Sequence, residues 1–148
     1  MKQFKGRVVV PGELTAEAVV SKQGFNCLAS FKKALLPLPS GKEAPCDDQN
    51  NENIYGIKMA GKALCLPLTI GSTTGGMIIY CVGDMGRLPA CMLYSKEVDP
   101  VSAAGIILND VWTDTPMPVI DKLGDEFLDY VQNGMKITIH KDGTVEVF

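Results

Sequence analysis

The sequence predicts an α/β fold in which βαβ units lie between β-rich ends. Two continuous apolar runs, residues 63–67 and 90–94, are typical of strands that are buried on both faces. Between them lie a glycine-rich turn and the apolar segment 77–82, whose composition alone suits either a strand or a helix. Because a right-handed crossover between parallel strands needs a helix, we expect a helix here. A second helix is expected to begin at Asp99 and Pro100, which suit the cap and the first helical position.

The first third of the chain carries strand signals and then a long irregular stretch. Residues 7–10 are β-branched and predict a strand, and residues 16–20 predict another. Pro11 and Gly12 predict a turn between them, so we expect a hairpin-like opening. Residues 21–53 contain three prolines and a long polar run, which predict a long loop. Such a loop is unusual in a compact domain and is often functional.

The last part of the chain returns to strand signals. Residues 118–120 predict a short strand, and residues 125–131 predict a helical turn. Residues 135–140 and 144–148 alternate between apolar and polar side chains, as half-buried strands do. The Asp-Gly pair between these two segments indicates a terminal hairpin.

Composition and charge limit the possible functions. The chain has 148 residues, of which 46% are hydrophobic and 21% charged, so we expect one globular domain over residues 1–148. Its net charge of −3 and its scattered lysines argue against a nucleic-acid partner. We find neither an apolar run of the roughly 20 residues that span a bilayer nor a signal-peptide pattern. We therefore expect a cytoplasmic protein without a membrane segment.

The cysteines do not form a metal-binding pattern. None of the five lies in a Cys-x-x-Cys pair, and two of them lie inside the apolar runs, where a free thiol behaves as a small hydrophobic group. Iron–sulfur clusters usually need closely spaced thiolates. We therefore expect that this chain alone binds neither a metal ion nor a cluster. The five are Cys27, Cys46, Cys65, Cys81 and Cys91.

The strongest local motif is the turn before the predicted helix, Gly71-Ser72-Thr73-Thr74-Gly75-Gly76. It brings hydroxyl groups and backbone N–H groups to a helix start, where the helix dipole favours an anion such as a carboxylate or a phosphate. The turn lacks the Gly-Lys-Ser/Thr of a P-loop. Judged by this motif alone, the favoured interpretation is that Ser72 or Thr73 only caps the helix.

Several segments, taken in order, resemble the small subunit of the aconitase X family. Gly71-Ser72-Thr73-Thr74-Gly75 is similar to that family's Gly-Ser-Ser-x-Gly turn. Each motif is weak alone, but the set is specific and covers residues 6 to 120 in the right order. The long segment 21–53 matches least well. The other matching segments are residues 6–13, 55–56, 59–67, 97–101 and 104–107.

This resemblance implies a swivelling β/β/α domain like the fourth domain of aconitases. It implies a heterodimer with a large subunit that carries an iron–sulfur cluster and much of the substrate site, so the small subunit is expected to be inactive alone. The family's reactions are dehydrations of small hydroxy acids. The expected substrate is cis-3-hydroxy-L-proline, and the alternative is phosphomevalonate.

The resemblance also implies roles for the turn. The first serine of the family's turn abstracts a proton, and that role carries over to Ser72. Gly71, Thr73, Thr74 and Gly75 are then expected to bind the substrate. Serine is a poor base in water, but backbone N–H groups and a helix N-terminus can stabilise its alkoxide in a site that excludes water. A Lewis-acidic iron on the other subunit would take the leaving hydroxyl.

Three positions around the turn depart from the family pattern. Ile70 stands where arginine is common, Thr69 where glycine is common, and Gly76 where serine is common. The missing arginine removes a bidentate anion clamp, which favours a smaller substrate than a phosphorylated one. Beside a dehydratase subunit, two alternatives stay open at this point. One is a non-catalytic swivelling module that binds an anion, and the other is an inactive member of the family.

Three residues outside the turn carry expectations of their own. Arg7, at the first strand, is expected to be solvated or ion-paired rather than to contact the substrate. His140 lies on the terminal hairpin with no obvious partner. Trp112 is expected in the core or at a subunit interface.

Overall fold

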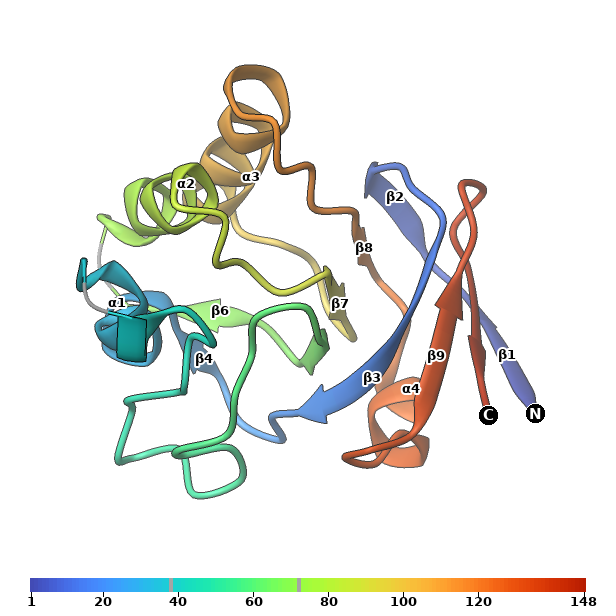
Figure 1. The fold of residues 1–148 in the computed structure, drawn as a ribbon. Coiled ribbons are helices and arrows are strands. Elements are labelled where there is room, and N and C mark those ends of the chain that lie inside the picture. Colours follow the sequence, from blue (N-terminus) through green and yellow to red (C-terminus); the bar gives the residue numbers. More distant parts are fainter. Residues whose placement is uncertain (38, 72) are drawn as a thin grey trace.

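Most of the strands form one strongly curled sheet. The computed structural model describes residues 1–37, 39–71 and 73–148, and within them eight strands follow one another across the sheet (Figure 1). In sheet order they are β1 (Lys2–Lys5), β10 (Thr144–Val147), β9 (Lys136–Ile139), β3 (Leu14–Val20), β5 (Ala63–Leu66), β7 (Cys91–Tyr94), β8 (Val119–Asp121) and β2 (Arg7–Val10).

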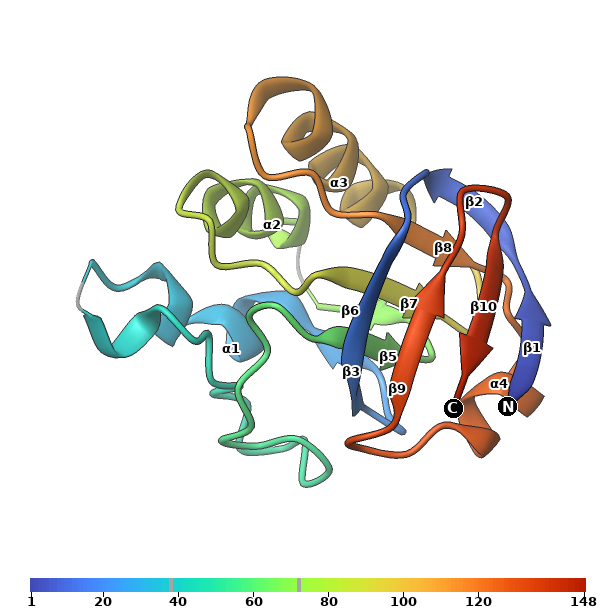
Figure 2. The ribbon, with the colours of Figure 1, turned by 45° about the vertical axis from the view of Figure 1, so that its right-hand side comes forward.

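The sheet curls because its two edge strands are neighbours in the chain. β1 and β2 lie at opposite ends of the strand order, yet only Gly6 separates them (Figure 2). The Gly6 N–H donates to the carbonyl oxygen of Gly143 at 3.1 Å. A Cβ atom at Gly6 would lie 2.5 Å from the carbonyl oxygen of Asp121. The bend that joins the two edges therefore requires glycine.

The centre of the sheet is parallel and confirms the predicted crossovers. β5 pairs with β7, and β7 pairs with β8. The first connection contains α2 (Gly75–Asp84), so residues 77–82 are helical as predicted, and the second contains α3 (Pro100–Trp112). These two βαβ units lie between antiparallel strands at both ends of the chain, in agreement with the predicted α/β fold class.

The central strands are buried on both faces, as their continuous apolar sequence predicts. Leu64 and Met92 belong to the core cluster that also contains Ile79 of α2 and Ile106 of α3. The residues that follow them in the strands belong to a second cluster on the opposite face, which includes Phe127. Phe127 lies on α4 (Asp125–Tyr130), the short helix that covers this second face.

Helices α2 and α3 lie side by side and touch through glycines (Figure 1). A Cβ atom at Gly76 would lie 2.2 Å from the carbonyl oxygen of Val101, and one at Gly105 would lie 2.0 Å from the carbonyl oxygen of Gly76. The two backbones can approach this closely only because neither glycine has a side chain. This contact brings the N-terminal ends of both helices together.

The predicted hairpin at the start of the chain is wrong. β2 pairs with β8, whereas β3 pairs with β9 on one side and with β5 on the other. The segment between β2 and β3 crosses the end of β8, where a Cβ atom at Gly12 would lie 2.3 Å from the ring of Pro118. The second half of β3 is buried throughout, and a two-stranded hairpin would leave one of its faces in water.

The predicted loop over residues 21–53 is only partly irregular. It contains β4 (Phe25–Asn26), α1 (Cys27–Phe31) and the short 3₁₀ helices η1 (Lys33–Leu35) and η2 (Pro39–Gly41). Phe25 and Phe31 are fully buried with ring centroids 5.5 Å apart, whereas Leu28 is exposed. β4 pairs with β6 (Thr69–Ile70), the strand that leads into the glycine-rich turn.

Candidate functional site

The glycine-rich turn connects β6 to α2. Gly71 has a φ of 112°, a value that strongly favours glycine, and a Cβ atom there would lie 3.1 Å from the side-chain oxygen of Asn26. The predicted base, Ser72, lies outside the described residues. The predicted substrate-binding residues Gly71, Thr73, Thr74 and Gly75 are described, and α2 begins at Gly75.

A cavity of 210 Å³ opens beside this turn. Of the predicted binding residues, Gly71, Thr73 and Gly75 line it, whereas Thr74 is not in its described lining. The other side of the cavity comes from β6 and from the start of α3, and no sequence motif predicted it. These lining residues are Thr69, Ile70, Asp99, Val101 and Ser102.

Two helix N-termini point to the same cavity. α2 begins with two glycines, so the side chains of these residues cannot block access to the first backbone N–H groups. α3 is capped as predicted, because the Asp99 carboxylate accepts the Ser102 N–H at 2.9 Å and Pro100 follows the cap. The negative charge of Asp99 neutralises one helix terminus, whereas the N-terminus of α2 can attract an anionic ligand.

A buried hydrogen-bond network joins β6 to the cap of α3. The Thr69 hydroxyl donates to Asp99 Oδ1, and it accepts a hydrogen bond from the Ser102 hydroxyl at 3.0 Å. The Tyr94 hydroxyl lies 3.4 Å from the same Thr69 oxygen. Burial tends to raise the pKa of Asp99, but the hydrogen bonds from Thr69 and Ser102 outweigh it and hold that pKa below its ordinary value. Asp99 is therefore ionised at neutral pH.

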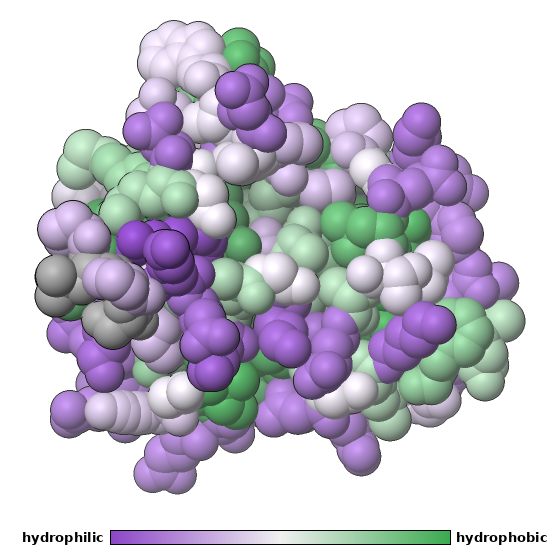
Figure 3. Space-filling model, in the orientation of Figure 1, coloured by the Kyte–Doolittle hydropathy of each residue, from purple (hydrophilic) through white to green (hydrophobic). Residues whose placement is uncertain are grey.

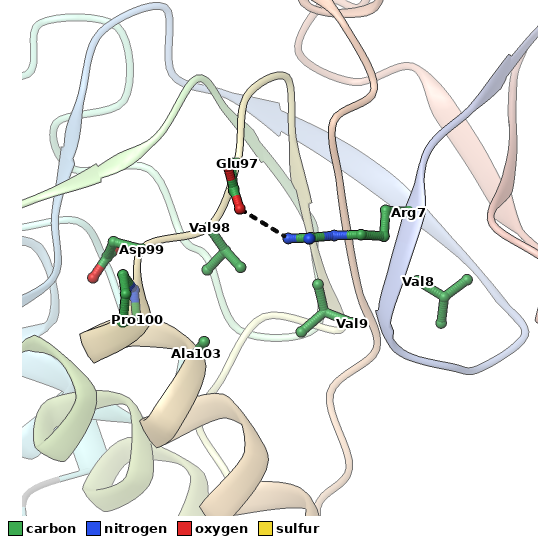
Figure 4. Close-up of a pocket in the computed structure, with 8 residues that line it drawn as sticks. All are labelled: Arg7, Val8, Val9, Glu97, Val98, Asp99, Pro100 and Ala103. Atoms are coloured by element: carbon green, nitrogen blue, oxygen red, sulfur yellow. Dashed lines mark ion pairs between the residues drawn. The ribbon is translucent and has the colours of Figure 1, made fainter.

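A second cavity of 610 Å³ lies on the other side of Asp99, and Arg7 lines it (Figure 4). Arg7 donates to both carboxylate oxygens of the fully buried Asp121, at 2.9 and 2.6 Å, and its guanidinium lies 3.7 Å from Glu97. The hydrogen bond to Asp121 raises the pKa of Arg7. Arg7 is thus ion-paired, as expected, and the lining of this cavity carries two carboxylates, Glu97 and Asp99, beside the one positive charge of Arg7.

An apolar groove of 460 Å³ runs between α2 and α3 and includes Thr73 and Gly76 at the turn. Met77, Tyr80 and Leu108 contribute to its lining. Figure 3 shows the mixed hydropathy of the face that carries these helices. Trp112 packs edge-on against Tyr80 but is 68% exposed, so the interpretation that places it in the core is wrong.

The buried thiols do not suit metal binding. Burial raises the pKa of Cys27 and of Cys91 to about 12, and it also raises the pKa of Cys65. Thiolates are the form that binds iron, so these three side chains are poor ligands. Among the described residues, we find no group of three or more potential metal ligands close together. Within the same residues, each helix is too short or too polar to cross a membrane.

His140 has partners that the sequence did not reveal. Its Nε2 bonds to Glu146, and its Nδ1 lies 3.7 Å from Glu13. The hydrogen bond to Glu146 raises the pKa of His140 above its ordinary value. The charged imidazole therefore stabilises the folded state. This stabilisation is complete below about pH 6.5, the pKa of histidine in the unfolded chain, and it is lost as the pH rises through the higher pKa of the folded state.

The variant His140→Gln is therefore expected to lower the melting temperature most at about pH 5 and least at alkaline pH. Thermal melts of the two proteins over that pH range test this. A difference that stays constant with pH would contradict the assigned ion pair.

Comparisons with known proteins give one consistent relationship. A sequence model of the aconitase X swivel domain matches residues 3–147. The phosphomevalonate dehydratase small subunit of Aeropyrum pernix is 26% identical over 145 residues, which cover 98% of this chain and 92% of that relative. The protein of the same name from Methanocaldococcus jannaschii is 28% identical, with 98% and 95% covered.

A solved structure agrees with these sequence relationships. The crystal structure of Thermococcus kodakaraensis aconitase X, in its holo-form, superposes on this chain with a TM-score of 0.82. The sequence identity is 26%, and the superposition covers 100% of this chain and 99% of the other. The fold expected from the family resemblance is confirmed by this match.

Proposed function

The chain belongs to the aconitase X swivel domain family, and we propose that it is the small subunit of a dehydratase that requires a large subunit for activity. The observation that carries this proposal is the extent of the match, which covers residues 3–147. The relatives are themselves small subunits of similar length, 92% and 95% of which are covered. A chain that matches them over most of their length is expected to need the same kind of partner.

The proposed substrate is phosphomevalonate. The names of the relatives support this substrate over cis-3-hydroxy-L-proline, which the sequence analysis favoured because Ile70 replaces the arginine clamp. Ile70 is 50% exposed at the cavity and offers no charge to a phosphate. The anion must then be held by the backbone N–H groups at the start of α2, by the hydroxyl of Thr73, or by the large subunit.

Within this complex, the proposed role of the turn is to remove a proton from the substrate. Ser72 is the proposed base, and the N-terminus of α2 would stabilise its alkoxide. Gly71 and Gly75 would let the substrate approach the backbone, and Thr73 would orient it. Once the carbon-bound proton has moved to the serine oxygen, the hydroxyl on the neighbouring carbon leaves and the double bond forms.

The iron–sulfur cluster of the proposed enzyme is assigned to the large subunit. The described cysteines of this chain do not fit a cluster, because four of them are buried and burial raises the pKa of their thiols. We expect iron analysis of the purified chain to give far less than one iron per chain, and the same analysis of the complex to give a stoichiometric amount. A cluster bound by this chain alone would overturn the assignment.

The substrate is tested in a complex reconstituted with the aconitase X large subunit from the same organism. We expect water elimination from phosphomevalonate, with kcat/KM at least about tenfold higher than for cis-3-hydroxy-L-proline, a difference of about 1.4 kcal/mol in transition-state binding. The reverse preference would return the assignment to hydroxyproline. Inactivity toward both, in a complex that forms, would favour a non-catalytic anion-binding module.

A further inference from the structure

A buried hydrogen-bond network centred on Thr69 lies behind the glycine-rich turn. Thr69 is only 8% exposed, and its hydroxyl has its full set of hydrogen bonds. Because its single hydrogen goes to Asp99, the hydrogen bond with Tyr94 must be donated by the phenol. Burial raises the pKa of Tyr94, so that proton stays on the phenol. Thr69 therefore donates once and accepts twice, and no hydrogen-bonding capacity is left for a substrate.

The network matters because the strand that leads into the turn is short. β6 is two residues long and pairs with the equally short β4. Thr69 lies in this strand, two residues before Gly71, and its side chain is bonded to the cap of α3 some 30 residues further along the chain. The Thr69–Asp99 hydrogen bond thus ties the strand that enters the turn to the helix on the other side of the cavity.

Both carboxylate oxygens of Asp99 also accept hydrogen bonds. Oδ1 accepts from the Thr69 hydroxyl, and Oδ2 accepts from the Ser102 N–H. One carboxylate therefore fixes both the start of α3 and the strand that enters the turn. α2 and α3 also touch through Gly76 and Gly105. The spacing between the turn and the start of α3, which form the two walls of the cavity, is therefore set by the hydrogen-bond network and by this glycine contact.

We propose that Thr69 and Asp99 are positioning residues that hold the glycine-rich turn in the geometry in which it acts on the substrate. The proposal rests on the proposed dehydratase function, because it assigns the turn a chemical task that needs precise placement. A displacement of about 1 Å at a reacting group can lower a rate by about 100-fold. Thr69→Val is the sharpest test, since valine keeps the shape of threonine and removes its hydroxyl.

In the reconstituted complex, Thr69→Val is expected to lower kcat by about 10- to 100-fold and to change KM by less than about threefold. Thr69→Ser restores the hydroxyl and should keep kcat within about threefold of the wild type. Asp99→Asn should resemble Thr69→Val, because an amide has one acceptor oxygen for the two donors that the carboxylate serves.

Thr115→Val is the matched control. The Thr115 hydroxyl donates to the carbonyl oxygen of Gly83 at 2.6 Å, so the same substitution removes a tie at the far end of α2. This control should lower stability without lowering kcat. If Thr69→Val keeps wild-type kcat in a folded complex, or loses no more than Thr115→Val, the positioning role is wrong. If Thr69→Val does not fold, the comparison of Thr69→Ser and Asp99→Asn decides in the same way.

A second measurement separates this inference from the proposed function. Amide hydrogen exchange of the full chain, alone and in the complex, should accelerate over residues 70–76 in Thr69→Val and not in Thr115→Val. An inactive wild-type complex with this exchange pattern would refute the dehydratase function and leave the positioning network standing. Unchanged exchange over residues 70–76 would overturn the network's role whatever the activity.

Discussion

Replacing Ser72 by alanine is expected to lower kcat of the reconstituted complex by about 10²- to 10⁴-fold, the usual contribution of a catalytic base. Folding and binding of the large subunit should be nearly unchanged. If the Ser72 hydroxyl only caps α2, the effects reverse, with a loss of about 0.5–2 kcal/mol in unfolding free energy and little loss of turnover. Steady-state kinetics and thermal melts of the same preparation distinguish the two.

Two neighbouring variants sharpen this test. Ser72→Thr keeps a hydroxyl that can cap a helix, but its added methyl group should misplace that hydroxyl for proton abstraction. Thr73 lines the cavity, and Thr73→Val is expected to raise KM more than it lowers kcat, as the loss of a positioning contact does. Near-full turnover of Ser72→Ala in a folded complex would move the base to the large subunit.

Gly76→Ala is expected to lower the unfolding free energy by about 3 kcal/mol, the upper range for overpacking. Its Cβ atom would lie 2.2 Å from the carbonyl oxygen of Val101, so α2 and α3 would have to separate. For a domain of this size, the loss corresponds to about 6–12 °C in melting temperature. Because the same contact brings the two helix N-termini to the cavity, activity should fall as well.

Gly75→Ala is the matched control for this prediction. The nearest atom to a Cβ there is the Cys27 Cβ at 3.9 Å, an ordinary contact. Alanine is also the better helix former, so stability should stay the same or rise by up to about 1 kcal/mol. The free energy of unfolding of both variants can be measured in denaturant or by heating. Equal destabilisation would show that the close contact at Gly76 does not hold α2 and α3 together.

The parts of the fold that depend on local pattern are predictable from the sequence. The two apolar runs and the rule for parallel crossovers identify β5, α2 and β7, and Asp99-Pro100 identifies the start of α3. The opening hairpin is wrong because local turn signals do not show that β8, more than 100 residues later, pairs with β2. The long irregular segment contains α1, whose cap is a single asparagine, Asn26, and whose five residues are too few for a clear helical period.

The candidate site is also predictable only in part from the sequence. Gly71, Thr73 and Gly75 lie within five consecutive residues of the sequence, and all three line the cavity. Thr69 and Asp99 meet only because β6 and the start of α3 lie together in the fold, and the pairing of Arg7 with Asp121 spans 114 residues. A hydroxyl and a carboxylate at such separations carry no local signal. The sequence contained one clue to this side of the site. Asp99 and Pro100 predicted the start of the second helix, and that helix start lines the cavity.

Titration of the large subunit with this chain tests the central claim most directly. With phosphomevalonate as substrate, each protein alone should be inactive, and activity should rise with added chain to a plateau at equimolar amounts. The Ser72→Ala chain should compete with the wild type and lower the plateau in proportion to its share. Full activity of the large subunit alone, or a plateau that the Ser72→Ala chain reaches equally well, would contradict a catalytic small subunit.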